Sequence, residues 1–254
     1  MNYSEEFYIG WQNRAPVGIG SHIRKTVVCL LFAILAAAFL LALAQRTIGL
    51  AVFEWGTVKS FSGTLKAQPY PHLLVQRPGK GSGWSAYYLV APFKFGLTGE
   101  NVPALDGKQV TLKGTLIYRE NQTMIEAQPA SIKPASPNLA APTESRLVNL
   151  GCQTLVGEIV DSKCYWGVMN PGRLTPHRGC AVRCISGGIP PVLLVRQATG
   201  PPLYFLLVSS EGRPVNKQVL DMVAQPVKIT GDVVRQGELS ILRADPSTYK
   251  RIQP

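Results

Sequence analysis

The chain has 254 residues, which is enough for two small domains or one larger domain. Charged residues make up only 16% of it, whereas glycine and proline contribute 24 and 20 residues. This mixture is typical of short strands and tight turns, and it argues against a protein built from long solvated helices. The formal net charge of +11 favours contact with an anionic surface: phospholipid headgroups, an acidic partner protein or nucleic acid.

An uncharged apolar segment, 26–44, is the first element along the chain. Its 19 residues are close to the ~20 that a helix needs to cross a bilayer. Arg24 and Lys25 directly precede it, and this positive flank favours a cytoplasmic position for residues 1–25. The sequence therefore predicts a single-pass protein of the bacterial inner membrane, with the bulk of the chain in the periplasm.

A cleavable signal peptide is the alternative for this segment, because Ala42 and Ala44 resemble the small residues that precede a cleavage site. The preceding stretch contains Phe7, Tyr8 and Trp11, which suit a segment at the membrane surface and favour an uncleaved anchor. Export of the remaining chain also argues against nucleic acid as its partner.

The predicted strands fall into two similar halves, 57–132 and 150–254, separated by a Pro-, Ala- and Ser-rich linker at 133–149. Residues 110–114 (VTLKG) match residues 227–231 (VKITG) in pattern: apolar and polar residues alternate, and a glycine then relaxes the strand. Each half offers about five such short strands. We therefore predict a mainly β protein with two tandem small OB-like β-barrel domains; a generic β-sandwich is the alternative.

The second half differs from the first by a long insertion at 161–191. From Gly63 to Leu73 the first half advances by ten residues, whereas from Gly157 to Leu193 the second advances by 36. About 26 extra residues thus lie between its first two strands, and a loop of that length is usually functional or cross-linked. The residues of this insertion that can carry chemistry are Cys164, His177, Cys180 and Cys184.

The spacing of these residues suggests a metal site. Residues 175–186 begin with a Thr-Pro pair and end before two glycines, which predicts a helix. On a helix, His177, Cys180 and Cys184 share one face, because they are three and then four residues apart. With Cys164 they form a set of three cysteines and one histidine, and such donors suit zinc or copper(I).

Disulfides are an equally strong hypothesis, because an even number of exported cysteines usually pairs. Cys164 would pair with Cys180 or Cys184, and the remaining cysteine with Cys152. A redox-active dithiol of Cys180 and Cys184 is a weaker hypothesis, because three residues separate them instead of the two of thioredoxin-type motifs. Cys29 lies within the apolar segment and is expected to serve there as a small apolar residue.

Charged residues of the insertion also have predicted roles. Asp161 would orient His177 as a metal ligand, or would simply end a strand. Arg178 and Arg183 flank the cysteines and would lower the pKa of the thiols. With Lys163 and Arg173 they form a positive loop that would dock on phospholipid or on an acidic redox partner, or would be an ordinary solvated surface.

The sequence carries no established enzymatic motif. It lacks a CxxCH haem-attachment site, a phosphate-binding P-loop, a dinucleotide-binding glycine fingerprint, an HExxH helix and a Gly-x-Ser-x-Gly elbow. Its exported acids are scattered, so no general acid–base pair can be nominated. A non-catalytic role is therefore expected.

Four segments of the second half together resemble a motif found in uncharacterised, membrane-anchored bacterial envelope proteins. They are GEIVDSKC (157–164), GVMNPG (167–172), HRGCA (177–181) and CISGGIPP (184–191). The resemblance implies an anchored envelope protein but no activity. The layout of an anchor before a small OB-like barrel is also similar to the periplasmic haem chaperone of cytochrome c maturation. The haem-binding His-x-x-x-Tyr pattern of that family has no counterpart here.

These features predict a membrane-anchored periplasmic accessory or assembly subunit of a membrane redox complex. Its partners would be the inner membrane and a protein of that complex, and its Cys/His loop would dock or would hold zinc or copper. The alternative is a thiol-dependent redox enzyme or a metal-transfer chaperone with Cys180 and Cys184 as the reactive pair. If the insertion is functional, removing residues 162–190 should leave a folded protein.

Overall fold

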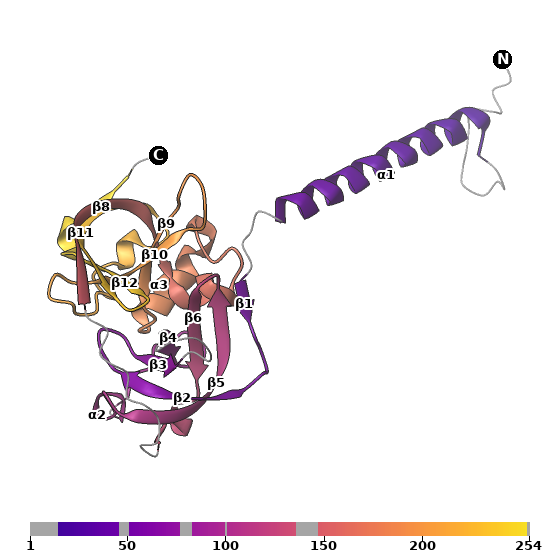
Figure 1. Cartoon of the computed structure of the whole chain (residues 1–254). Coiled ribbons are helices and arrows are strands. Elements are labelled where there is room, and N and C mark those ends of the chain that lie inside the picture. The colour runs from indigo at the N-terminus through magenta and orange to yellow at the C-terminus, as the bar shows by residue number, and fades with distance from the viewer. Residues whose placement is uncertain (1–14, 46–50, 77–82, 100, 136–146, 253–254) are drawn as a thin grey trace. The chain divides into compact units, whose positions relative to one another are not determined.

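The computed structural model of the chain (Figure 1) divides it into an N-terminal unit, Met1–Gly49, and a β unit, Leu50–Pro254. The residues that the structure describes are 15–45, 51–76, 83–99, 101–135 and 147–252. The aromatic residues Phe7, Tyr8 and Trp11 lie outside this described part, as do most of the residues of the predicted linker.

The N-terminal unit contains one long helix, α1 (Val17–Gln45), which includes the whole predicted segment 26–44. The helix begins directly after Pro16, a residue that suits a helix start because its missing N–H would be unpaired there. Between Val17 and Ala44 the helix is long and apolar enough for a membrane span or a signal sequence, and its apolar window is unburied.

The first β-barrel has five strands: β2 (Lys59–Lys66), β3 (His72–Gln76), β4 (Trp84–Val90), β5 (Gln109–Arg119) and β6 (Gln122–Ala127). Neighbours run in the order β5-β2-β3-β4-β6, and β6 also pairs with β5, which closes the barrel. All these pairs are antiparallel except β4 with β6. Three short elements accompany it: β1 (Ala51–Phe53) and β7 (Lys133–Pro134) on β5, and α2 (Asn101–Ala104).

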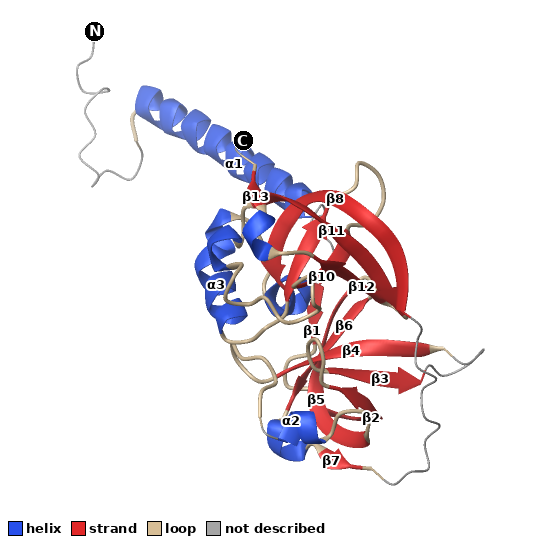
Figure 2. Ribbon diagram, turned by 90° about the vertical axis from the view of Figure 1, so that its left-hand side faces the viewer, coloured by secondary structure: helices blue, strands red, loops and turns tan. Residues whose placement is uncertain are grey.

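The second β-barrel repeats this connectivity with β8 (Leu147–Asp161), β9 (Pro191–Val195), β10 (Leu203–Val208), β11 (Pro226–Gln236) and β12 (Leu239–Arg243). The order is β12-β10-β9-β8-β11, the β11–β12 pairing closes the barrel, and β10–β12 is again the parallel pair. Figure 2 shows β8, β10, β11 and β12 of this barrel. Short elements are β13 (Lys250–Arg251) on β11 and the 3₁₀ turns η5 (Leu220–Met222) and η6 (Pro246–Thr248), while the 3₁₀ turn η2 (Pro129–Ser131) follows β6 of the first barrel. Two closed five-stranded barrels confirm the predicted OB-like fold and rule out the β-sandwich.

The repeated strand pattern has the expected physical basis. In β11, Val227 and Ile229 are fully buried, while Lys228 between them is exposed. Gly114 and Gly231 occupy equivalent places on the fourth strand of each barrel, and an added Cβ at either would lie less than 3.0 Å from a neighbouring backbone oxygen. Glycine at this place lets the neighbouring strand approach.

The ends of the predicted linker 133–149 belong to strands. Its first two residues form β7, and its last three begin β8. The long β11 requires this extension, because its residues 234–236 pair with 147–149 beyond a bulge.

The insertion between β8 and β9 contains a π-helical turn, η3 (Cys164–Val168), a 3₁₀ turn, η4 (Thr175–His177), and a helix, α3 (Arg178–Ser186). The last two elements confirm the predicted helical segment. Trp166 of η3 is fully buried, with its ring centroid 5.2 Å from that of Tyr88 in the first barrel and 6.2 Å from that of Tyr204 in the second. One apolar core thus runs from the first barrel through the insertion into the second. The insertion is therefore part of the core of the β unit, which argues against the prediction that its deletion leaves a folded protein.

A candidate metal centre between the two barrels

Three of the five cysteines meet in the insertion. The Cys164 Sγ atom lies 3.9 Å from both Cys180 Sγ and Cys184 Sγ, and all three sulfur atoms lie within 4.8 Å of one another. Cys164 begins η3, and the other two lie one turn apart on α3, beside the second barrel (Figure 2). Cys164 and Cys184 are buried, and Cys180 is half-buried.

None of these cysteines is in a disulfide, and neither is Cys29 or Cys152. A bonded pair would have its sulfur atoms about 2.05 Å apart, roughly half the separation found here. Cys152 is exposed on β8, opposite Asp232, and does not join the cluster. The predicted disulfide framework is therefore wrong for this structure, because its fourth partner points elsewhere and the other three thiols share one site.

The local fold around Cys164 is fixed by backbone hydrogen bonds. The buried Asp161 carboxylate accepts the backbone N–H of Cys164 at 2.7 Å, so the strand turns directly into η3. The Cys164 carbonyl then accepts the N–H of Met169 at 2.9 Å, which closes the turn. Gly167 is required within it, because an added Cβ would lie less than 3.0 Å from the backbone oxygen of Val52 in the first barrel.

His177 contacts the site through Asp161. Its Nε2 atom lies 3.0 Å from the second carboxylate oxygen of Asp161, and both side chains are buried. The predicted contact between Asp161 and His177 is therefore present. Donor atoms of Asp161, Cys164 and His177 also lie within 4.8 Å of one another. The four predicted residues thus form two groups. Cys164 belongs to both: one group contains the three thiols, and the other contains Cys164, His177 and Asp161.

The cation next to the thiols comes from the first barrel, which the sequence did not indicate. Lys94, in the loop after β4, donates from Nζ to Cys180 Sγ at 2.7 Å and to Cys184 Sγ at 3.9 Å. Arg178 instead donates to the Asp221 backbone carbonyl at 3.0 Å. The thiol-activating role predicted for the two insertion arginines therefore falls to Lys94, a residue 86 positions before Cys180 that no local motif connects to it.

The three thiols have unequal acidity. A hydrogen bond from Cys164, aided by the positive charge of Lys94, holds the pKa of Cys184 below its ordinary value. The pKa of Cys164 is raised, because its proton is shared with Cys184 and because its thiol is buried. The hydrogen bond to Cys180 raises the pKa of Lys94, which keeps the ammonium charged. The cluster is therefore prepared to hold a thiolate beside a cation.

A cavity of about 350 Å³ opens above the thiols. Its remaining wall is largely apolar and aromatic and includes Phe53, Trp55, Phe93, Val168 and Met169. Trp55 and Phe93 stand at 78% and 81% exposure, and Phe93 has a φ of 60°, a left-handed conformation that is costly for a bulky residue. Small-molecule sites of proteins have this size and this apolar lining with few polar groups.

Lys163 does not belong to a positive docking surface, contrary to the prediction. It is buried at 2% exposure, forms an ion pair with Glu126 at 2.5 Å and donates to the backbone carbonyls of Ala91 and Phe93 at 2.9 and 2.7 Å. A buried ammonium is tolerated only with such partners. Lys163 therefore fastens the loop that carries Lys94 to the insertion.

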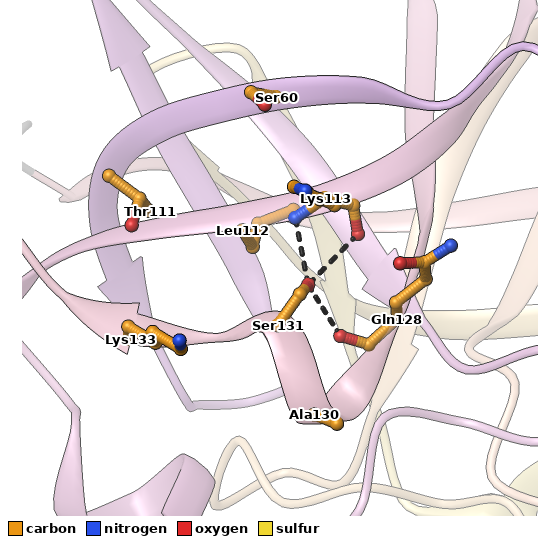
Figure 3. Close-up of a pocket in the computed structure, with 8 residues that line it drawn as sticks. All are labelled: Ser60, Thr111, Leu112, Lys113, Gln128, Ala130, Ser131 and Lys133. Carbon is orange, nitrogen blue, oxygen red and sulfur yellow. Dashed lines mark hydrogen bonds between the residues drawn. The ribbon is translucent and has the colours of Figure 1, made fainter.

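A larger cavity of about 430 Å³ on the first barrel offers no comparable chemistry. It lies near η2, where the Ser131 hydroxyl accepts the backbone N–H of Lys113 and contacts the Lys113 and Gln128 carbonyl oxygens (Figure 3). Its lining contains neither cysteine, histidine nor an acid. The thiol cluster is therefore the better candidate site.

No protein-family model, curated protein or solved structure matches the chain.

Proposed function

We propose that Cys164, Cys180 and Cys184 bind one soft metal ion, zinc or copper(I). The observation that carries this proposal is the size of the sulfur triangle. Two of its sides are 3.9 Å and the third is at most 4.8 Å, so the point equidistant from the three sulfur atoms lies about 2.3–2.5 Å from each, close to the usual zinc–thiolate bond length of about 2.3 Å. A metal ion therefore fits with little movement of the chain, and three thiolates are the donors that soft ions prefer.

His177 and Asp161 have a supporting role in this proposal. His177 contacts one oxygen of the Asp161 carboxylate, and the other oxygen accepts the backbone N–H of Cys164. The pair therefore helps to position Cys164. Residues that position ligands in this way commonly change metal affinity 10- to 100-fold when they are replaced. The imidazole lies close to Cys164, but it does not belong to the three-thiol group.

For the whole protein we infer a periplasmic accessory or assembly subunit of a membrane redox complex, anchored in the inner membrane by α1. Support comes from the apolar helix, from a thiol site held between two β-barrels, and from the exposed aromatic side chains at its mouth. Redox complexes need metal ions delivered during assembly, and an open thiolate site can hold and release such an ion.

A thiol-dependent redox enzyme or metal-transfer chaperone is the second candidate. It is favoured by Lys94, whose ammonium stabilises a thiolate at Cys184, because a stabilised thiolate is also a nucleophile. Both sulfur separations of 3.9 Å involve Cys164. The reactive pair would therefore be Cys164 with one cysteine of α3, in place of Cys180 with Cys184.

The experiment that tests the proposed role compares membranes from the native bacterium with and without the chain. We expect its loss to lower the metal content and activity of one membrane redox complex. Wild-type chain and the Cys152→Ser control should restore both, and Cys164→Ser, Cys180→Ser or Cys184→Ser should not. Full restoration by the three site variants would contradict a role for the thiol cluster.

A further inference from the structure

We infer that the physiological ion of this site is copper(I) and that it enters and leaves through the apolar cavity past Met169. The inference rests on the proposed metal-binding function and narrows it to a metal and a route. It follows from the donor atoms around the thiols, from the open side of the sulfur triangle, and from the place of Met169.

The donors at the centre are all sulfur. Zinc normally takes four ligands, so at three thiolates it would need a fourth nitrogen or oxygen donor or a water molecule. The nearest imidazole, His177, contacts Asp161 through Nε2 and is grouped with Cys164, but it does not belong to the three-thiol group. Copper(I) is the first-row ion that soft thiolate and thioether donors favour most, and three sulfur atoms suffice for it.

The open side of the triangle offers little that would favour a hydrated divalent ion. Among the described residues of the cavity wall, the one carboxylate belongs to Glu126, and it is paired with buried Lys163. The nearest charged group to the thiols is the Lys94 ammonium, which is a cation and cannot ligate. An ion approaching from the cavity must therefore shed its water, which costs a monovalent soft ion far less than a divalent one.

Of the described residues that line this cavity, Met169 supplies the one soft donor besides the cysteines. It lies directly after η3, lines the same cavity as the three cysteines, and is 45% exposed. Its backbone is held by the hydrogen bond to the Cys164 carbonyl, so its side chain starts from a fixed point next to the site. A thioether is a weak ligand for copper(I), which suits a transient contact during ligand exchange.

The step requires no redox partner. Copper stays in the +1 state: its bonds to the donor that delivers it break, bonds to three sulfur atoms form, and remaining thiol protons pass to solvent. The Met169 sulfur would bond to copper before the incoming or outgoing donor has fully departed.

The first test uses the full-length chain, reduced and kept anaerobic in detergent. It is given copper(I) as its bathocuproine disulfonate complex, or zinc sulfate, and X-ray absorption reports the ligands. We expect one copper(I) per chain bound by three sulfur atoms, retained in the presence of equimolar zinc. Displacement of copper by equimolar zinc, or copper bound through nitrogen or oxygen, would overturn the inference while leaving a soft-metal site in place. Binding of neither ion would instead refute the proposed function.

The second test measures the rate at which bathocuproine disulfonate removes copper(I) from loaded protein. In Met169→Leu we expect the three-sulfur coordination to persist and the rate to fall about tenfold, because one stabilising contact in the exchange step is lost. Met222→Leu is the matched control, since Met222 lies in η5 and outside the cavity wall. Equal rates in wild type and Met169→Leu would contradict the route.

Discussion

At the scale of single residues, the site depends on a lysine that lies in the other half of the chain. Lys94 lies against Cys180 and Cys184, whereas Arg183, which is closer in sequence, is exposed on α3. The pKa of Cys184 is lowered first by its hydrogen bond from Cys164 and further by the charge of Lys94. Electrostatic support from a neighbouring cation favours the thiolate over the thiol.

Replacing Lys94 should therefore make the cluster harder to deprotonate. In metal-free, reduced Lys94→Met we expect the thiolate absorbance of the protein to appear at higher pH than in wild type. The direction follows because Cys184 titrates below its ordinary pKa when the ammonium is present and loses part of that support without it. Arg183→Met is the control and should titrate like wild type; an equal shift in both variants would point to net charge alone.

His177 should tune metal binding without being essential to it. Because it contacts Asp161 and does not join the three-thiol group, we expect His177→Ala to weaken metal affinity by about 10- to 100-fold. Cys184→Ser should abolish stoichiometric binding. Competition with a chromophoric chelator measures both affinities. A complete loss in His177→Ala, equal to that in Cys184→Ser, would make the imidazole a direct ligand.

At the scale of elements, the glycine pair that ends α3 forms one of the closest backbone contacts between the insertion and the first barrel. The Gly187 carbonyl accepts the Gly96 N–H at 2.9 Å, and an added Cβ on Gly187 would lie less than 3.0 Å from the Lys94 carbonyl oxygen. This close approach also sets the position of the Lys94 loop over the thiols. The sequence predicted that the helix ends before Gly187 and Gly188, but the partner that these glycines approach is remote in the chain and could not be predicted.

Gly187→Ala should therefore destabilise the β unit and loosen the site together. We expect a loss of about 1–3 kcal/mol in the free energy of unfolding, as for other overpacked contacts. Gly179→Ala in the same helix is the control, because nothing lies within 4 Å of its added Cβ and alanine favours helix. Urea unfolding measures both. Equal stability of the two variants would show that the first barrel does not pack against α3 as described.

The features that the sequence predicted correctly depend on residues close together in the chain, whereas those that it missed depend on contacts between residues far apart in the chain. Strand alternation, the glycine bends and the helix of the insertion are local signals, and each was confirmed. The convergence of Cys164 with the α3 thiols was also predictable from spacing along one segment. Lys94 and the burial of Lys163 were not, because both depend on contacts between halves that are remote in the chain and follow no period.

At the scale of the whole molecule, the insertion joins the two barrels through a shared core. It supplies the fully buried Trp166, Ile185 and Ile189, and buried Lys163 ties it to the first barrel. A folded state without these side chains would expose the apolar surfaces of both barrels to water.

Deleting residues 162–190 should therefore abolish cooperative folding of the β unit, contrary to the expectation for an independent functional loop. Circular dichroism during heating should show no sharp transition for the deletion, whereas the triple variant Cys164→Ser, Cys180→Ser, Cys184→Ser should keep one. The comparison separates the structural role of the insertion from the role of its thiols. A deletion variant that melts as sharply as wild type would mean that the barrels fold without it.

The central claim is that three cysteines of this chain hold a metal ion, and it is tested most directly by counting metal and reactive thiols together. The full-length protein would be purified anaerobically from its native envelope, analysed for metal, and alkylated before and after chelation. We predict one copper or zinc ion per chain, with Cys164, Cys180 and Cys184 protected until the metal is removed and Cys152 reactive throughout. Metal-free protein whose three cysteines react at once, or are found in disulfides, would contradict the account.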